Sequence, residues 1–173
     1  MIYKEKLKDI KAFVFDVDGI FTDGTIYLMP DGSMCRTMNV LDGYAVVRAL
    51  KSGYKIGIIT GGDDPMVKQR IHYLGITDYY SKSQNKVMDY QDFKEKNNLN
   101  DSEILMMGDD IPDREVIKMA HIGACPPNAV PEIKKVADYI TLVNGGSGAV
   151  RDVIEQVMKA QGKWDIQDNT QSI

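Results

Sequence analysis

Two aspartates one residue apart, Asp16 and Asp18, directly follow the apolar run Ala-Phe-Val-Phe at residues 12–15. The run predicts a buried strand whose carboxyl end delivers both aspartates into a loop, which is where open α/β sheets build ligand sites. Two carboxylates this close repel each other unless a cation joins them or one takes a proton. A hard cation such as Mg²⁺, bound together with a phosphorylated substrate, satisfies both conditions.

Residues suited to binding phosphate stand after a second predicted strand, at residues 55–59. Thr60, Gly61 and Gly62 follow it and precede a predicted helix. Backbone N–H groups at that position, helped by the helix N-terminus, can hold phosphate oxygens. Lys86 opens the next predicted helix; a lysine there is usually solvated, but it could also reach a phosphate as a point charge.

A second acidic group, Asp109, Asp110 and Asp113, follows a predicted strand at residues 103–107. Helix capping by Asp110 would explain only one of these three carboxylates. Acidic residues this dense are electrostatically expensive without a cation, so the group again favours a metal site.

Strand and helix signals alternate along the chain, which predicts parallel strands joined by helical crossovers and hence a three-layer α/β sandwich. Pro65, Pro112 and Pro131 stand near first helical positions, where the missing N–H costs least, and Asp42 and Asp64 are expected helix N-caps. The predicted strands are 12–15, 55–59, 103–107, 122–125 and 139–142, and the predicted helices are 42–51, 65–73, 86–97, 112–119, 131–136 and 149–160.

Residues 25–40 interrupt this alternation. Two short apolar stretches flank a Pro-Asp-Gly turn, which predicts a β-hairpin that leaves the sheet just after the first aspartates and projects over the site. Ile26, Leu28, Met34 and Met38 would then be exposed on a monomer, which suggests packing on another subunit. A hairpin folded back on its own domain is an equally open alternative.

Composition excludes several classes of protein. The 173 residues most simply form one domain, with 25 acidic and 21 basic residues and a net charge of −4. No basic block indicates a nucleic-acid surface, and no apolar run reaches membrane length. Cys35 and Cys125 do not make a disulfide framework and the N-terminus does not resemble a signal peptide, so the cytoplasm is the expected compartment.

In the order Asp-x-Asp, Thr, Lys and Gly-Asp-x-x-x-Asp, these groups resemble the four motifs of the haloacid dehalogenase (HAD) superfamily. The resemblance implies a Rossmann-like fold and a Mg²⁺-dependent phosphatase that forms an aspartyl-phosphate. Asp16 would be the nucleophile and a metal ligand. Asp18 would be the general acid/base, with its backbone carbonyl on the metal.

The resemblance also implies roles for the later motifs. Thr60 and Lys86 would hold the phosphoryl oxygens, and Asp109 would ligate Mg²⁺. Asp113, with Asp110 as a possible partner in this task, would orient Lys86 or a metal-bound water. The intervals after the first motif and between Thr60 and Lys86 are too short for a cap domain. The resemblance therefore implies a capless phosphatase domain over residues 1–162 and a C-terminal tail over residues 163–173.

Further segments resemble one subfamily, the 3-deoxy-D-manno-octulosonate 8-phosphate (KDO 8-phosphate) phosphatases. They are residues 39–44, 58–61, 74–76, 108–110, 145–151, 160–163 and 171–173. The resemblance implies hydrolysis of KDO 8-phosphate in lipopolysaccharide precursor synthesis, by a homotetramer whose hairpin and tail reach a neighbouring site. The residues expected to contact this phosphorylated sugar acid are Asp18, Asn39, Val40, Asp42, Gly43, Gly61, Gly62, Arg70 and Lys86. Arg70 and Arg48 are the candidates for binding its carboxylate, with Arg70 better placed, and the tail offers Lys163 and Trp164.

Two departures leave the exact sugar acid open. Leu41 replaces an arginine of the subfamily pattern, and Gly62 replaces an arginine that many relatives carry. The principal alternative is 2-keto-3-deoxynononate 9-phosphate phosphatase. Gly62 and the tail favour the octulosonate over this alternative. A non-catalytic relative fused to cytidylyltransferases is disfavoured by the intact motifs. A phospho-acceptor receiver domain, a different class, is disfavoured because its acidic pair and its phosphorylated aspartate occur in the opposite order.

Overall fold

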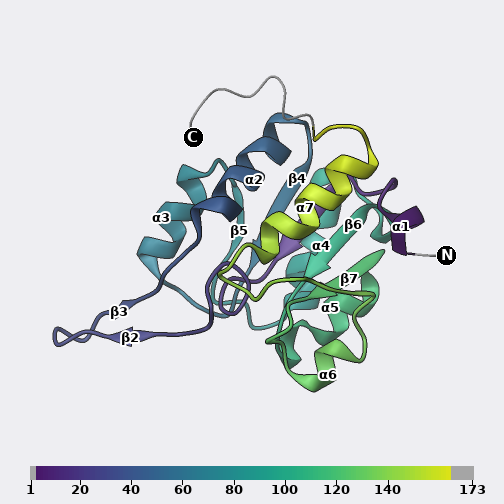
Figure 1. Cartoon of the computed structure of the whole chain (residues 1–173). Coiled ribbons are helices and arrows are strands. Elements are labelled where there is room, and N and C mark those ends of the chain that lie inside the picture. The colour runs from purple at the N-terminus through teal and green to yellow at the C-terminus, as the bar shows by residue number, and fades with distance from the viewer. Residues whose placement is uncertain (1–2, 165–173) are drawn as a thin grey trace.

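A six-stranded sheet, parallel at every pairing between described residues, forms the centre of the molecule (Figure 1). The computed structural model describes residues 3–164. The sheet has the order β5-β4-β1-β6-β7-β8. Its strands are β1 (Ala12–Phe15), β4 (Lys55–Ile59), β5 (Asp78–Tyr80), β6 (Ile104–Met107), β7 (Ile122–Cys125) and β8 (Tyr139–Ile140), and β2 (Tyr27–Leu28) and β3 (Met34–Cys35) form a separate hairpin.

Helices cover both faces of the sheet. Those of the described chain are α1 (Tyr3–Lys6), α2 (Val40–Lys51), α3 (Pro65–Tyr73), α4 (Lys86–Asn97), α5 (Arg114–Met119), α6 (Pro131–Lys134) and α7 (Ala149–Ala160). Phe13 and Phe15 of β1 pack with α2, α3 and α7 on one face, whereas Ala12 and Val14 pack with α4 and α5 on the other. This alternation buries every residue of β1 and fixes the register in which its carboxyl end presents the following aspartates.

The predicted three-layer α/β sandwich is confirmed, and so are the elements that carry the motifs. The strand β5 was not predicted, because three residues at the edge of the sheet give no period-two signal. The predicted helix at 112–119 is divided into a 3₁₀ turn over residues 111–113 and α5.

The expected N-cap role of Asp42 is wrong. Helix α2 begins at Val40, and Asn39 caps it by accepting the N–H of Leu41. Asp42 is wholly buried, and its Oδ1 accepts the N–H of Arg151 at 2.8 Å in the first turn of α7. Its other oxygen has no hydrogen-bond partner, and burial raises the pKa of this carboxyl to about 6. Asp42 therefore joins α2 to α7.

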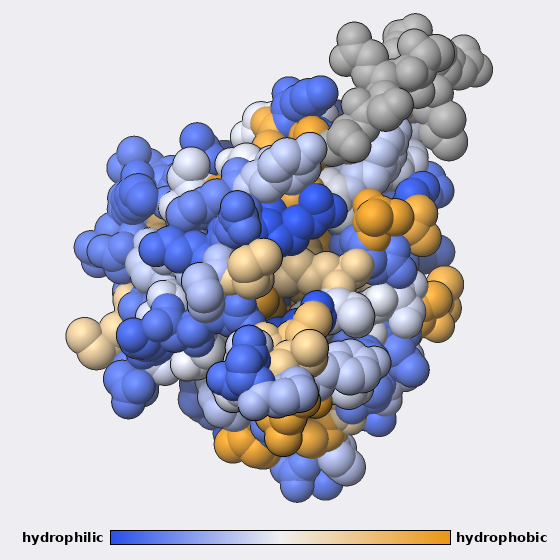
Figure 2. Space-filling model, turned by 90° about the vertical axis from the view of Figure 1, so that its left-hand side faces the viewer, coloured by the Kyte–Doolittle hydropathy of each residue, from blue (hydrophilic) through white to orange (hydrophobic). Residues whose placement is uncertain are grey.

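The predicted hairpin is present and projects from the body of the molecule beside α3 (Figure 1). Leu28 is 81% exposed, and Ile26 and Met34 are also exposed. Figure 2 views this side of the molecule and shows hydrophobic residues among the hydrophilic surface. Met38 departs from the expectation, because it is partly buried against the core. The alternative of a hairpin folded back on its own domain is not observed.

The described start of the tail packs on its own chain. Trp164 is only 8% exposed and lies edge-on to Tyr44, with the Arg48 guanidinium 4.7 Å from its ring centre. The Lys163 ammonium lies over the ring of Tyr54. Trp164 and the Arg48 guanidinium thus pack on each other within one chain, whereas Lys163 is exposed. The rest of the expected tail, residues 165–173, lies outside the described residues.

Candidate active site

The carboxyl ends of β1, β4 and β6 border one polar cavity of about 350 Å³. This is the position expected for a ligand site in a parallel sheet, because the chain runs from β1 to β4 and β5 on one side of β1 and then crosses to β6 on the other side. The predicted site residues that line it are Asp16, Asp18, Thr60, Gly61, Gly62, Lys86, Asp109, Asp110 and Asp113, and Gly19, Gly24, Ser83 and Pro112 complete its wall.

A buried lysine joins two of the motifs. The Lys86 Nζ lies 3.0 Å from Asp16 Oδ2 and 2.6 Å from Asp113 Oδ1, and all three side chains are nearly inaccessible. Burial disfavours the charged lysine, but the two carboxylates outweigh burial and raise the pKa of Lys86. This lysine therefore stays cationic beside Asp16, where it can neutralise an incoming phosphate.

Asp113 organises the loop that follows β6. Its Oδ2 accepts the backbone N–H groups of Asp109 and Asp110 at 3.1 and 3.3 Å, while its Oδ1 accepts from Lys86. The close packing requires a glycine at position 108, since a Cβ there would lie 2.3 Å from the Asp113 Cγ. Asp113 thus fixes both the lysine and the acidic loop.

Asp109 lies against the glycine that follows the first motif. A Cβ on Gly19 would come within 2.0 Å of Asp109 Oδ2, and Gly19 has a φ of +79°, which a side chain would strain. Burial, with the nearby charges of Asp113 and Asp110, raises the pKa of Asp109 to about 6. Gly19 therefore allows β6 to place its carboxylate beside the loop that follows β1.

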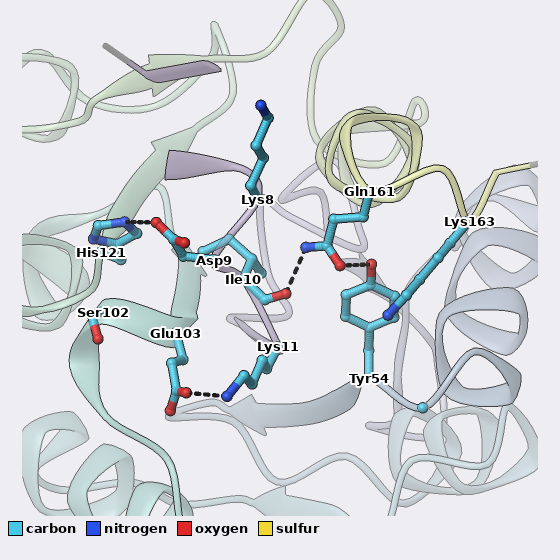
Figure 3. A pocket seen from close by; sticks show the side chains of 11 residues that line it. Lys8, Asp9, Ile10, Lys11, Tyr54, Ser102, Glu103, His121, Gln161 and Lys163 are labelled. Atoms are coloured by element: carbon cyan, nitrogen blue, oxygen red, sulfur yellow. Dashed lines mark hydrogen bonds and ion pairs between the residues drawn. The ribbon is translucent and has the colours of Figure 1, made fainter. Parts of the chain in front are cut away.

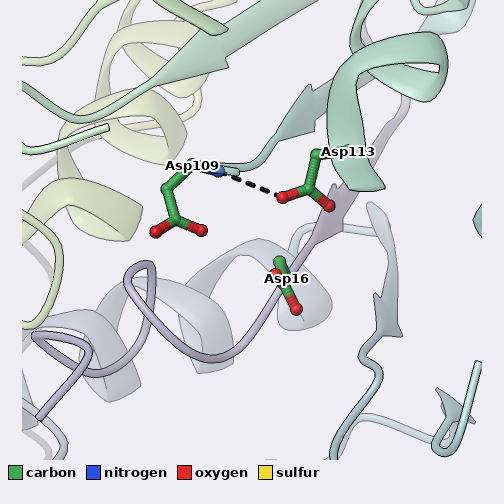
Figure 4. A group of neighbouring side chains, drawn as sticks. All are labelled: Asp16, Asp109 and Asp113. Atoms are coloured by element: carbon green, nitrogen blue, oxygen red, sulfur yellow. Dashed lines mark hydrogen bonds between the residues drawn. The ribbon is translucent and has the colours of Figure 1, made fainter. Parts of the chain in front are cut away.

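The Asp16 carboxyl lies where it can bind a cation. Burial and the Asp113 charge raise the pKa of Asp16 to about 7, and Lys86 offsets this only in part. Oxygens of Asp16, Asp109 and Asp113 lie within 4.8 Å of one another, and Figure 4 shows their side chains converging. Both Asp113 oxygens already accept hydrogen bonds. The donor set therefore fits a hard divalent ion held chiefly by Asp16 and Asp109, with Asp113 orienting the loop.

The segment after β4 forms the opposite wall. Thr60 is buried, and its Oγ1 accepts the N–H of Gly62 at 3.2 Å. Gly62 also lies beside Asp18, since a Cβ at this position would be 3.8 Å from Asp18 Oδ2. Because Gly61 has open space around its Cα, its backbone is accessible to an anion.

Sequence reasoning missed Arg36, which follows β3 at the base of the hairpin. Its Nε donates to Asp18 Oδ1 at 2.7 Å, and its Nη1 donates to Asp64 Oδ2 at 2.8 Å. The only sequence feature that pointed to this contact was an arginine in a hairpin that was expected to pass over the first motif. A spacing argument could not identify which hairpin residue turns inward.

Five residues that were predicted to bind substrate do not line the 350 Å³ cavity. They are Asn39, Val40, Asp42, Gly43 and Arg70. Asn39 and the exposed Val40 stand at the start of α2, and Asp42 and Gly43 are buried behind it. Arg70 packs against Gly43 and lines a second cavity of about 530 Å³, together with Arg36, Asp64 and methionines of the hairpin and α3.

A larger cavity of about 760 Å³ lies at the opposite end of the strands, next to the amino ends of β1, β4, β6 and β7 (Figure 3). Several of its polar groups bind one another: Gln161 donates to the Ile10 carbonyl and accepts from Tyr54, and Lys11 pairs with Glu103. These contacts join α7 to the underside of the sheet. None of the motif residues lines this cavity, so the larger cavity is not the candidate active site.

Comparison with known proteins identifies relatives of this chain. The sequence model of the haloacid dehalogenase-like hydrolases matches residues 73–154. The 3-deoxy-D-manno-octulosonate 8-phosphate phosphatase KdsC of Escherichia coli is 36% identical over 160 residues, which are 92% of this chain and 85% of that protein.

Two solved structures superpose closely on the fold. One is the phosphatase of the same name from Moraxella catarrhalis, in complex with magnesium, phosphate and KDO. It has a TM-score of 0.91 and 36% identity, covering 94% of this chain and 93% of the other. The second, from Yersinia pestis, has a TM-score of 0.91 and 30% identity, covering 92% and 86%.

Proposed function

The chain belongs to the haloacid dehalogenase-like hydrolases, in the family of the KDO 8-phosphate phosphatases, and we propose that it hydrolyses KDO 8-phosphate to KDO and inorganic phosphate. The observation that carries the proposal is the buried Asp16–Lys86–Asp113 group beside Asp109, at the carboxyl ends of three parallel strands. A carboxylate beside a cation and a metal-binding partner suits attack on a phosphate monoester.

The first step transfers the phosphoryl group to the enzyme. An Asp16 oxygen attacks phosphorus in line while the bond to the sugar oxygen breaks, which gives an aspartyl-phosphate and the sugar alcohol. Mg²⁺ held by Asp16 and Asp109 would supply positive charge that lowers the repulsion between carboxylate and phosphate dianion. Lys86 and the Thr60–Gly62 segment hold the phosphoryl oxygens, and protonated Asp18 gives its proton to the leaving oxygen.

The second step releases phosphate. Asp18, now ionised, takes a proton from a water molecule that attacks the phosphorus of the aspartyl-phosphate, and Asp16 is regenerated. The same carboxyl group thus serves as acid and then as base. Asp18 suits this work because it is the more exposed of the two motif aspartates and lies outside the Asp16–Asp109–Asp113 cluster.

The sugar acid extends from the catalytic cavity toward the hairpin. The 350 Å³ cavity is lined by the groups proposed to hold phosphate, whereas the neighbouring 530 Å³ cavity offers Arg70, since Arg36 already pairs with Asp18 and Asp64. A guanidinium binds a carboxylate in a two-pronged geometry, so Arg70 is the residue proposed to bind the substrate carboxylate. Asn39, Val40 and Gly43 stand at the start of α2, next to this path.

The kcat/KM values for KDO 8-phosphate and 2-keto-3-deoxynononate 9-phosphate test the substrate. We expect about a tenfold or greater preference for the eight-carbon compound, since an extra carbon unit is commonly discriminated by that factor. A preference for the nonulosonate would replace the proposed substrate with the alternative. A single phosphoryl transfer per chain without turnover of either compound would indicate a phospho-acceptor domain. The Asp16→Asn variant, purified in the same way, controls for contaminating phosphatases.

The proposal also covers the domain, the assembly and the cellular role. The catalytic domain spans residues 1–162. Four chains associate through their hairpins, where the exposed Ile26, Leu28 and Met34 support burial against a neighbouring chain. The reaction serves lipopolysaccharide precursor synthesis in the cytoplasm. Across residues 3–164, no helix combines the length and apolar character needed to span a bilayer. Light scattering tests the association: we expect a tetramer for the native chain and smaller species for Leu28→Lys.

A further inference from the structure

Arg36 makes a forked contact with the second motif aspartate. Besides the 2.7 Å bond from Nε to Asp18 Oδ1, its Nη2 lies 3.4 Å from Asp18 Oδ2. The Arg36 side chain is only 9% exposed although it belongs to a projecting hairpin. A part-buried guanidinium that contacts both oxygens of one carboxylate restricts the orientation of that carboxylate.

The other side of Arg36 is fixed by a rigid element. Its Nη1 donates to Asp64 Oδ2 at 2.8 Å, and Asp64 Oδ1 accepts the N–H groups of Met66 and Val67 at the start of α3. Asp64 is therefore held by the helix that it caps. The chain of contacts runs from the N-terminus of α3 through Asp64 and Arg36 to Asp18.

The position of Asp18 differs from that of its neighbours. Oxygens of Asp16, Asp109 and Asp113 gather within 4.8 Å, and Asp18 is not one of this group. Its Oδ2 instead lies beside Gly62, on the wall formed by the segment after β4. A free carboxylate two residues from Asp16 would be attracted to a cation bound between Asp16 and Asp109.

We propose that Arg36 is a positioning residue that holds the Asp18 carboxylate away from the metal-binding cluster, on the side of the cavity where water enters in the second step. This role rests on the proposed phosphatase reaction. Arg36 itself neither attacks phosphorus nor transfers a proton; it acts through Asp18. Because Arg36 stands at the base of the hairpin, the hairpin contributes to the chemistry of its own subunit as well as to its surface.

A double-mutant cycle with Asp18 tests the proposal. We expect Arg36→Gln to lower kcat for KDO 8-phosphate by about tenfold or more, within the range that acid–base catalysis contributes, while KM changes less than about twofold. In an Asp18→Asn background the same substitution should change kcat by less than about twofold, because its effect passes through the missing carboxylate. Equal losses in both backgrounds would overturn the proposal.

Three further measurements separate positioning from general damage. Arg36→Lys, which keeps the charge but not the fork, should recover only part of the lost kcat, and full recovery would contradict an orienting role. Arg114→Gln, at an exposed arginine paired with Glu115, is the matched control and should leave kcat unchanged. Magnesium binding by calorimetry should be as tight or tighter in Arg36→Gln, since Asp18 is then free to approach the ion. Weaker binding would indicate a collapsed site and would refute the proposal.

The substrate assignment can fail independently. If the wild-type protein hydrolyses p-nitrophenyl phosphate but not KDO 8-phosphate, the proposed substrate is wrong and the cycle is carried out with the aryl ester. Its leaving group needs no proton, so Arg36→Gln should then impair the hydrolysis of the aspartyl-phosphate and produce a burst of p-nitrophenol. A uniform slowing without a burst would overturn the role of Arg36 while leaving phosphatase activity intact.

Discussion

Replacing Lys86 with methionine should destabilise the metal-free protein severely at neutral pH. The ammonium lies between Asp16 and Asp113 at 3.0 and 2.6 Å, and the three side chains are 7%, 12% and 1% exposed. Methionine fills a similar volume but leaves two buried carboxylates without their cation. Removing one partner of a buried ion pair typically costs about 3–5 kcal/mol, which is a large part of the roughly 5–15 kcal/mol that stabilises a native domain.

The loss should depend on pH in a defined direction. Above about pH 7 Asp16 ionises, and in the variant it then lies beside Asp113 without a cation, whereas in the wild-type protein the Lys86 ammonium lies between the two side chains. Protonation at lower pH relieves the repulsion, so the difference in unfolding free energy between the two proteins should shrink as pH falls from about 8 to about 5.5. Bound Mg²⁺ should restore part of the lost stability at the higher pH.

Urea unfolding followed by circular dichroism, with EDTA and then with Mg²⁺, measures these differences. Lys118→Met is the matched control, because Lys118 pairs with Glu115 on the surface and should change the unfolding free energy by less than about 1 kcal/mol. The reasoning is refuted if Lys86→Met is as stable as the wild-type protein in EDTA at about pH 8. It is also refuted if the loss is the same at both pH values.

Three other substitutions and two pH-dependent measurements test separate parts of the site. Asp16→Asn should keep the fold and abolish turnover, whereas Asp18→Asn should impair an alkyl phosphate more than an activated aryl phosphate; equal losses for the two esters would argue against an acid role. Because the raised pKa values of Asp16 (about 7) and Asp109 (about 6) let protons compete with the ion, Mg²⁺ affinity measured by calorimetry should fall as pH is lowered from 8 toward 6, and constant affinity would contradict this. The same raised values mean that ionisation in the folded, metal-free protein is unfavourable. Stability is therefore lost as pH rises through 6 to 7, and the melting-temperature gain from Mg²⁺ should be larger at pH 8 than at pH 5.5. Gly108→Ala should destabilise the protein by about 1–3 kcal/mol and lower kcat, because its Cβ would displace Asp113; unchanged urea unfolding would show that the loop yields freely.

The cavity that contains Asp16, Thr60 and Asp109 could be predicted from the sequence, because parallel strands bring their carboxyl ends to the same end of the sheet. An apolar run followed by Asp16 and Asp18 fixed the central strand, and Thr60 and Asp109 followed strands of the same kind. The spacing of a motif along one strand is set by the period of two, which is a local property. The positions of Asp16, Thr60 and Asp109 after strands were therefore accessible to reasoning from periodicity, whereas their chemical roles were implied by the resemblance to the haloacid dehalogenase motifs.

Contacts between distant elements were not accessible in this way. Asp42 is of a residue type that often caps helices and stands near the start of α2, but Asn39 caps that helix. The buried Asp42 carboxylate instead accepts the N–H of Arg151 in α7. Arg36 turns inward because Asp64 and Asp18 both face the base of the hairpin. Trp164 closes on Tyr44 and Arg48 of α2 rather than reaching outward. Each of these outcomes depends on tertiary packing, which no short window of sequence contains.

The measurement that tests the central claim most directly is identification of the covalent intermediate. The protein is mixed with KDO 8-phosphate and Mg²⁺, quenched in acid within the first turnover and digested for mass spectrometry. We predict one phosphoryl group on the peptide that contains Asp16, located on that residue, and no phosphoryl group in the Asp16→Asn variant. Phosphate release by the wild-type protein with no phosphorylated peptide, together with full activity of Asp16→Asn, would contradict the account.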